Sequence, residues 1–120
     1  MKNITDYICE LDEITLARAR EYLNTGKIKS VKFTRIEGDP NEFEGFIWEG
    51  EQVLMPGIEV DAAFNVSDIH CQCNDADDLC VHKVALLLAA QIMIDTNCPD
   101  YHMALNQQTA NTLNTMLFPS

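Results

Sequence analysis

Residue types that bind metal ions are concentrated in one short stretch of this chain, HCQCNDADDLCVHK at residues 70–83. It contains three of the five cysteines and two of the three histidines in the 120-residue sequence. Cysteine thiolates and neutral imidazoles are the ligands that Zn²⁺ most often takes in proteins. The spacing of these residues decides whether their side chains can reach one ion together.

Four of these residues form two pairs that are separated by the six-residue spacer NDADDL. Cys71 and Cys73 are two residues apart, so on an extended strand both sulfurs project from the same face. Cys80 and His82 would point about 200° apart on a regular helix, so we expect this pair to straddle a helix start near residue 81. The polar, turn-forming spacer can reverse the chain. The spacing predicts a closed tetrahedral site of three thiolates and one imidazole, which is typical of structural Zn²⁺.

Other interpretations of the stretch remain open at this stage. A disulfide between two of the cysteines is one, an iron–sulfur cluster is another, and a nucleophile pair formed by Cys80 and His82 is a third. Iron–sulfur sites generally show a different cysteine spacing, and a nucleophile pair would need an orienting third group that the sequence does not reveal. The chain has no GxxxxGK[ST], HExxH or GxSxG motif. We therefore expect no enzymatic activity.

The elements that must position the pairs predict an α+β fold. DEITLARAREYLNTG (residues 12–26) predicts a helix with Asp12 as its N-cap and Gly26 in a left-handed conformation after its end. Residues 27–73 predict a small antiparallel sheet of three to four strands, and residues 52–61 are expected to form one of them. VHKVALLLAAQIMI (residues 81–94) predicts a long buried helix. The site would join the last strand to this helix.

The motif C-Q-C followed six residues later by C-V-H, and then by an apolar helix, resembles the SWIM zinc finger. That family is found in bacterial helicase-like ATPases, Mutator-type transposases and a kinase-linked ubiquitin ligase. Upstream, RAREYLNTGKI and FEGFIWEG resemble the helix-to-strand segment and the strand before the finger, so the resemblance covers about residues 14–92. We expect residues 1–96 to form the zinc finger domain with its N-terminal helix and sheet, and residues 97–120 to form a C-terminal tail with short helices. The resemblance also implies a domain that binds nucleic acid or proteins and has no catalytic role. The implied zinc ligands are Cys71, Cys73, Cys80 and His82.

The charge of the chain distinguishes a protein partner from a nucleic-acid partner. The net charge is −11, and residues 37–80 carry twelve acidic side chains and no basic one. Nucleic-acid binding normally requires a basic surface, and the aspartates of the spacer would repel phosphate. We therefore expect a protein partner, with the module acting alone or within a larger nucleic-acid-processing assembly. The alternative is nucleic-acid binding through a local basic segment, which could equally be a solvated face: Arg18, Arg20, Lys27, Lys29, Lys32 and Arg35.

The sequence also predicts where the protein is located and whether copies of it associate. Residues 1–12 lack the pattern of a signal peptide, and no apolar run approaches the roughly 18 to 20 residues of a membrane span. We expect a cytoplasmic protein without membrane contact, where reduced cysteines bind metal more often than they form disulfides. The helix predicted at residues 81–94 is apolar on nearly all sides, so a second copy could cover it if the fold does not.

Several single residues have simpler interpretations. His70 should point to the strand face opposite Cys71, and Cys98 and His102 should be packed or exposed side chains and not ligands. The aromatic residues Phe43, Phe46 and Trp48 could stack on a base or a peptide, but we expect them in the core.

Overall fold

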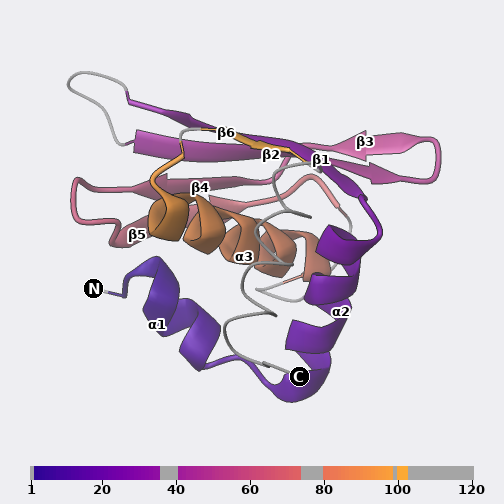
Figure 1. Cartoon of the computed structure of the whole chain (residues 1–120), viewed down its shortest axis with the longest axis horizontal. Helices are drawn as coiled ribbons and strands as arrows, with labels where there is room; N and C mark the ends of the chain where they lie inside the picture. Colours follow the sequence, from indigo (N-terminus) through magenta and orange to yellow (C-terminus); the bar gives the residue numbers. More distant parts are fainter. Residues whose placement is uncertain (1, 36–40, 74–79, 99, 103–120) are drawn as a thin grey trace.

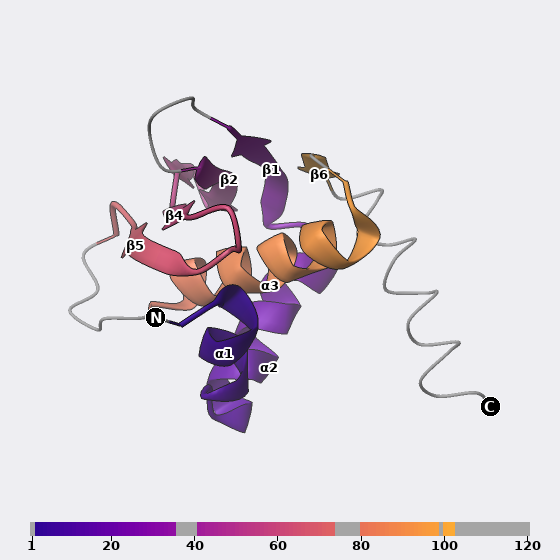
Figure 2. The same cartoon turned by 90° about the vertical axis from the view of Figure 1, so that its left-hand side faces the viewer.

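The computed structural model describes residues 2–35, 41–73, 80–98 and 100–102, the last three by their backbone alone. It confirms the α+β class: three helices lie on one side of a six-stranded antiparallel sheet (Figure 1). One helix packs directly on the sheet and the other two pack on that helix (Figure 2). In chain order the elements are α1 (Ile4–Cys9), α2 (Glu13–Asn24), β1 (Ile28–Thr34), β2 (Asn41–Glu49), β3 (Gln52–Leu54), β4 (Gly57–Val60), β5 (Val66–His70), α3 (Val81–Thr96) and β6 (Asp100–His102).

The predicted N-terminal helix is confirmed as α2. The Asp12 carboxylate accepts the backbone N–H of Thr15 at 2.7 Å, as an N-cap residue does. Gly26, just beyond the helix end, has a φ of 74°, which glycine adopts without steric cost. The preceding short helix α1 was not predicted. Asn3 and Asp6 form a capping box that fixes its start.

The sheet differs from the prediction in two places. Residues 52–61 form two strands instead of one, because Pro56 interrupts the pairing and its carbonyl accepts the N–H of Gly45 at 2.9 Å. Accordingly β3 and β4 pair with opposite ends of β2, and the strand order is β5-β4-β2-β1-β6 with β3 beside β2. Strand β6 pairs with β1 and lies in the segment expected to be a tail. The helices expected there would fall at residues 103–120, outside the described residues.

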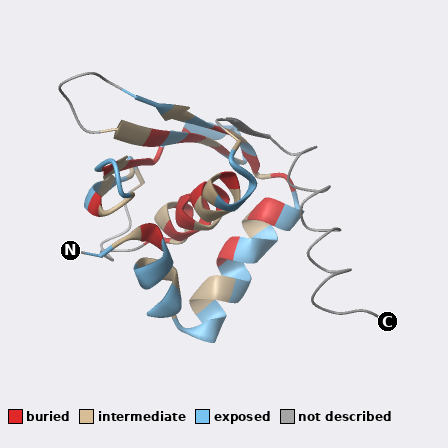
Figure 3. Cartoon of the chain, turned by 60° about the vertical axis from the view of Figure 1, so that its left-hand side comes forward, coloured by how far each residue is buried: buried red, intermediate tan, exposed pale blue. Residues whose placement is uncertain are grey.

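The long helix α3 forms the centre of the core. Figure 3 shows its residues almost entirely as buried or intermediate, and only Asp95 and Thr96 at its end are exposed. A Cβ at Gly45 of β2 would lie 3.0 Å from Leu86 Cδ1, so the glycine allows this close contact of helix and sheet. The sheet, α1 and α2 all pack on α3, and eight of its residues are buried by these contacts.

The expectation of a core position for the three aromatic residues of β2 holds for one of them. Phe43 is buried and Phe46 is half-buried. The prediction was wrong for Trp48, because 49% of its surface is exposed. Side chains alternate along a strand, so Phe43 and Ile47 face the helices while Phe46 and Trp48 face away.

Among the described helices, none combines the length and the hydropathy that crossing a bilayer requires.

Truncating Leu86 tests the packing of α3 on the sheet. Leu86→Ala should lower the free energy of unfolding by about 2–5 kcal/mol, because it leaves a cavity in a fully buried layer. Urea unfolding measures the change, and Leu88→Ala, the same truncation at a half-buried position of α3, should lose clearly less. Equal losses in the two variants would contradict this packing.

Candidate metal centre

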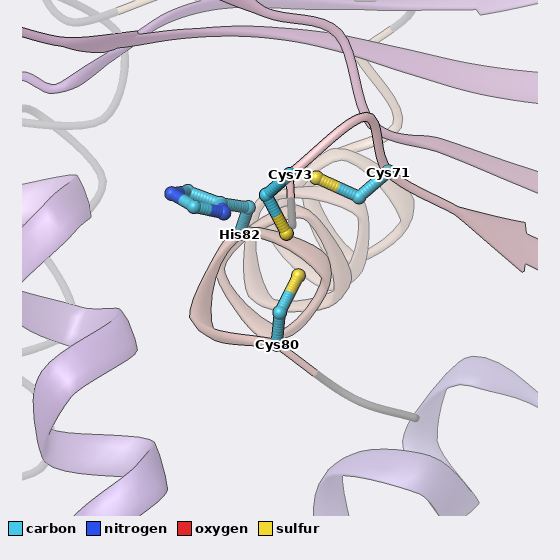
Figure 4. Close-up of side chains that lie close together, drawn as sticks. All are labelled: Cys71, Cys73, Cys80 and His82. Carbon is cyan, nitrogen blue, oxygen red and sulfur yellow. The ribbon is translucent and has the colours of Figure 1, made fainter. Parts of the chain in front are cut away.

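The structure brings the four predicted ligands together. The three Sγ atoms and one ring nitrogen of Cys71, Cys73, Cys80 and His82 all lie within 4.8 Å of one another, an arrangement that can hold a metal ion (Figure 4). The first pair follows directly after β5, and the second straddles the start of α3. The helix start expected near residue 81 is therefore confirmed, although the spacer itself lies outside the described residues.

Local backbone geometry leaves the sulfur of Cys80 available to this cluster. Cys80 is the N-cap residue of α3 and has an extended backbone, with φ −69° and ψ 164°. As the N-cap residue, its side chain stands at the first turn of α3, where the backbone N–H of Lys83 lowers the pKa of the thiol against the larger raising effect of burial. Between the first two cysteines, the Gln72 side chain accepts the Met55 N–H at 2.9 Å, which holds the segment against the β3–β4 connection.

The imidazole of His82 has one nitrogen with a partner and one without. Nε2 lies 3.1 Å from Glu49 Oε2, whereas Nδ1 is buried and has no hydrogen-bond partner among the described residues. A hydrogen bond from Tyr22 and, to a lesser extent, one from His82 hold the pKa of Glu49 below its usual range. The ionised carboxylate can only accept, so in the neutral imidazole that binds metal Nε2 carries the proton and Nδ1 presents a lone pair. A buried acceptor left unpaired is costly, and a metal ion would satisfy it.

Glu49 orients this imidazole and is itself held by two other side chains. It accepts a hydrogen bond from the Tyr22 hydroxyl and lies 3.6 Å from Lys27 Nζ. The Tyr22 ring meets the His82 ring edge to face at 5.7 Å between centroids. Burial raises the pKa of Tyr22 to about 12, so its hydroxyl remains a donor. The imidazole is thus fixed by α2 and β2 as well as by its own helix.

Burial also governs the charge of the thiols. It raises the pKa of Cys71 to about 12 and raises the pKa of Cys80. Gathering three thiolates at one point therefore requires a cation to offset their charge, and a divalent ion reduces the total to −1. The donor set fits a soft or borderline metal ion, because hard ions such as Ca²⁺ and Mg²⁺ bind through oxygen.

The remaining histidines and cysteines lie outside this group. His70 points to the opposite sheet face as predicted, where its Nε2 lies 3.4 Å from Glu42 Oε1. Cys9 is exposed on α1, and Cys98 Sγ contacts the Thr96 carbonyl oxygen at 3.6 Å. None of the five cysteines, all of which are described, forms a disulfide. The side chain of His102 is outside the described part of the structure.

The six basic residues of the predicted nucleic-acid segment do not share one face. The two arginines of α2 are two positions apart, so they point about 200° from each other. The side chain of Lys27 contacts Glu49, and the Arg35 guanidinium lies 5.7 Å from the Phe33 ring centroid. The residues are spread over several elements. Arg18 and Arg20 lie on α2, Lys27 in the turn after it, Lys29 and Lys32 on β1, and Arg35 just beyond β1.

Comparisons of the chain with protein-family models, with curated proteins and with solved structures each give no match. The resemblance to SWIM zinc fingers therefore rests on the sequence alone, and the structure adds that the four side chains of the motif can hold a metal ion.

The sequence interpretation missed Glu49 and Tyr22, which lie far from the motif in the chain. Only strand alternation could have indicated Glu49. It lies two residues after Ile47 and therefore on the face of β2 that Phe43 and Ile47 turn toward the helices. Tyr22 on α2 could not be assigned without the packing of α2 beside α3.

Removing the carboxylate tests its role in orienting His82. Glu49→Ala should weaken binding of Co²⁺ by about 10–100-fold, because loss of such an outer partner frees the imidazole to rotate. A Co²⁺ titration followed by visible absorption measures this affinity. Glu51→Ala, at an exposed position in the turn after β2, should bind Co²⁺ as the unmodified protein does. Identical affinities for all three proteins would show that Glu49 does not support the site.

Proposed function

We propose that this protein is a zinc-binding interaction module of the SWIM type. Cys71, Cys73, Cys80 and His82 hold one structural Zn²⁺, and the domain that this ion stabilises contacts protein partners. The observation that carries the proposal is the convergence of four ligand atoms within 4.8 Å, one from each residue, together with a buried His82 Nδ1 that has no hydrogen-bond partner among the described residues. We also propose that the protein works in a reducing compartment such as the cytoplasm, which keeps these thiols available.

Zinc is favoured over other ions by the ligand set. Three thiolates and one imidazole form a common structural Zn²⁺ site, with four protein ligands in a tetrahedral arrangement. Such a site has no position for a water or a substrate, so we assign no catalytic step to it. Second-sphere support of the kind that Glu49 gives His82 is usual at zinc sites, where a carboxylate fixes the orientation of a ligating histidine.

The ion would act as a cross-link within the core. It joins the end of β5 to the first turn of α3, and α3 contributes eight buried residues to the fold. A chain of 120 residues buries enough surface for only modest stability, so a metal that binds the folded state alone adds directly to it. The role proposed for zinc is therefore to hold α3 in place.

A protein partner is favoured over nucleic acid by charge. The net charge of −11 opposes the approach of phosphates, and the basic residues between positions 18 and 35 do not form a common surface. We therefore propose a protein and not a nucleic acid as the partner.

Metal analysis of purified protein tests the zinc site. We expect about one zinc per chain, as for a closed four-ligand site, when the protein is prepared without added metal. Cys80→Ser and His82→Ala should each lose it, because each removes one of the four ligands. Cys98→Ser is the matched control and should keep its zinc. Elemental mass spectrometry gives the stoichiometry, and retention of zinc in both ligand variants would refute the assignment.

Removal of the metal should loosen one part of the fold. With a strong chelator we expect faster backbone hydrogen exchange in residues 66–73 and 80–95, which the ion joins, and a lower melting temperature. Amides paired between β1 and β2 should change less, because that pairing does not involve the site. Uniform exchange and unchanged melting of a protein first shown to contain zinc would contradict a structural role.

A further inference from the structure

One face of the sheet is turned away from all three described helices, as Figures 1 and 2 show. The register identifies its side chains, because the buried partners Phe43 and Ile58 face the helices and their strand neighbours face away. We call this the outer face. It carries Lys32 on β1, Glu42, Glu44, Phe46 and Trp48 on β2, Val53 on β3, Glu59 on β4, and Asp68 and His70 on β5.

One end of the outer face is apolar. Trp48, Val53 and Met55 are three of the four large hydrophobic side chains that are exposed among the described residues, at 49%, 43% and 42%. Trp48 and Val53 are direct cross-strand partners, and Phe46 is the next outward residue of β2. We call Phe46, Trp48, Val53 and the adjoining Met55 the apolar patch. Exposed apolar side chains grouped around a tryptophan in this way are typical of sites that bind other proteins.

The other end of the outer face is acidic. Glu42 is paired with Glu59, and Glu59 with Asp68, so three carboxylates stand side by side on three neighbouring strands. Like charges directly opposite each other destabilise a sheet. His70 Nε2 lies 3.4 Å from Glu42 Oε1 and Lys32 lies across from Glu44, but the side chains of Glu59 and Asp68 make no ion pair among the described residues. We call Glu42, Glu59 and Asp68 the acidic row.

We infer that the outer face binds a protein segment in which an aromatic or aliphatic anchor is followed by several lysines or arginines. The anchor covers the apolar patch, and the basic side chains neutralise the acidic row. Along β2, Phe46 and Glu42 are four residues apart, or about 13 Å, a span that about four extended residues cover. The inference rests on the proposed role as a protein-binding module and names the surface and the partner chemistry. Nucleic acids and anionic membranes are disfavoured, since both would meet the acidic row.

Trp48 supplies a direct readout because it is the only tryptophan in the chain. The probe is a synthetic peptide with a Phe-Leu pair, two glycines and four lysines. It should shift the Trp48 emission to shorter wavelength, and its affinity should fall about tenfold or more between about 50 and 300 mM salt. A peptide with glutamates in place of lysines and one with serines in place of the Phe-Leu pair should produce no shift. An equal response to all three peptides, or no response to the first, would overturn the inference.

Two variants that retain Trp48 locate the binding surface. Val53→Ser removes part of the apolar patch, and Glu59→Lys with Asp68→Lys reverses the acidic row; each should weaken binding about tenfold or more. The controls are Ile14→Ser, at a side chain of α2 that is 75% exposed, and Glu13→Lys beside it, and both should bind as before. Unchanged binding in the outer-face variants would overturn the inference. So would an emission shift in the protein alone that follows dimer formation, because a second copy would then be the occupant.

Zinc content and melting temperature are measured on the same samples, so the two proposals can fail separately. If the protein contains one zinc per chain but does not bind the peptide, the proposed binding surface is refuted and the zinc site is supported. A protein that binds the peptide but contains no zinc supports the docking surface and refutes the zinc site.

Discussion

The imidazole of His82 is held from both sides, and the arrangement of the fold depends on that contact. On one side its Nε2 lies 3.1 Å from the Glu49 carboxylate of β2, and on the other the ring contributes one nitrogen to the group that it forms with three sulfurs. Through this ring the end of β5, the start of α3 and the end of β2 meet at one point, with Tyr22 of α2 supporting the carboxylate. Since α3 lies between the sheet and the other two helices, fixing its first turn fixes the layer on which they pack.

The two faces of the sheet have different roles. Its inner face carries the core and, at one end, the carboxylate that orients His82. The outer face has no described helix over it, and the same strand β2 places Trp48 there, next to Glu49 in sequence. Strand alternation thus puts a residue that supports the metal site and a residue of the apolar patch at adjacent positions. A metal that stabilises the inner layer would also hold the outer surface in a fixed shape for a partner.

Much of the site could be predicted from the sequence because its ligands are close together along the chain. The spacing of Cys80 and His82 required a helix start near residue 81, and the structure has it there. Glu49 lies 33 residues before His82, and only the packed sheet brings them together. In the fold, α2 and α3 followed from capping and composition, while β6 was missed because its pairing with β1 depends on contacts across most of the chain. The error over Trp48 arose from treating three aromatic residues as a group, although the parity of their positions separates Phe43 from the other two.

X-ray absorption at the zinc edge of the purified protein identifies the atoms bound to the metal and so tests the four proposed ligands. A closed site of these four ligands predicts three sulfur neighbours at about 2.3 Å and one nitrogen neighbour of imidazole type at about 2.0–2.1 Å. It also predicts no bound water, since the four protein side chains complete the coordination. A first shell with fewer than three sulfurs, or with an oxygen from solvent, would contradict a closed site formed by Cys71, Cys73, Cys80 and His82.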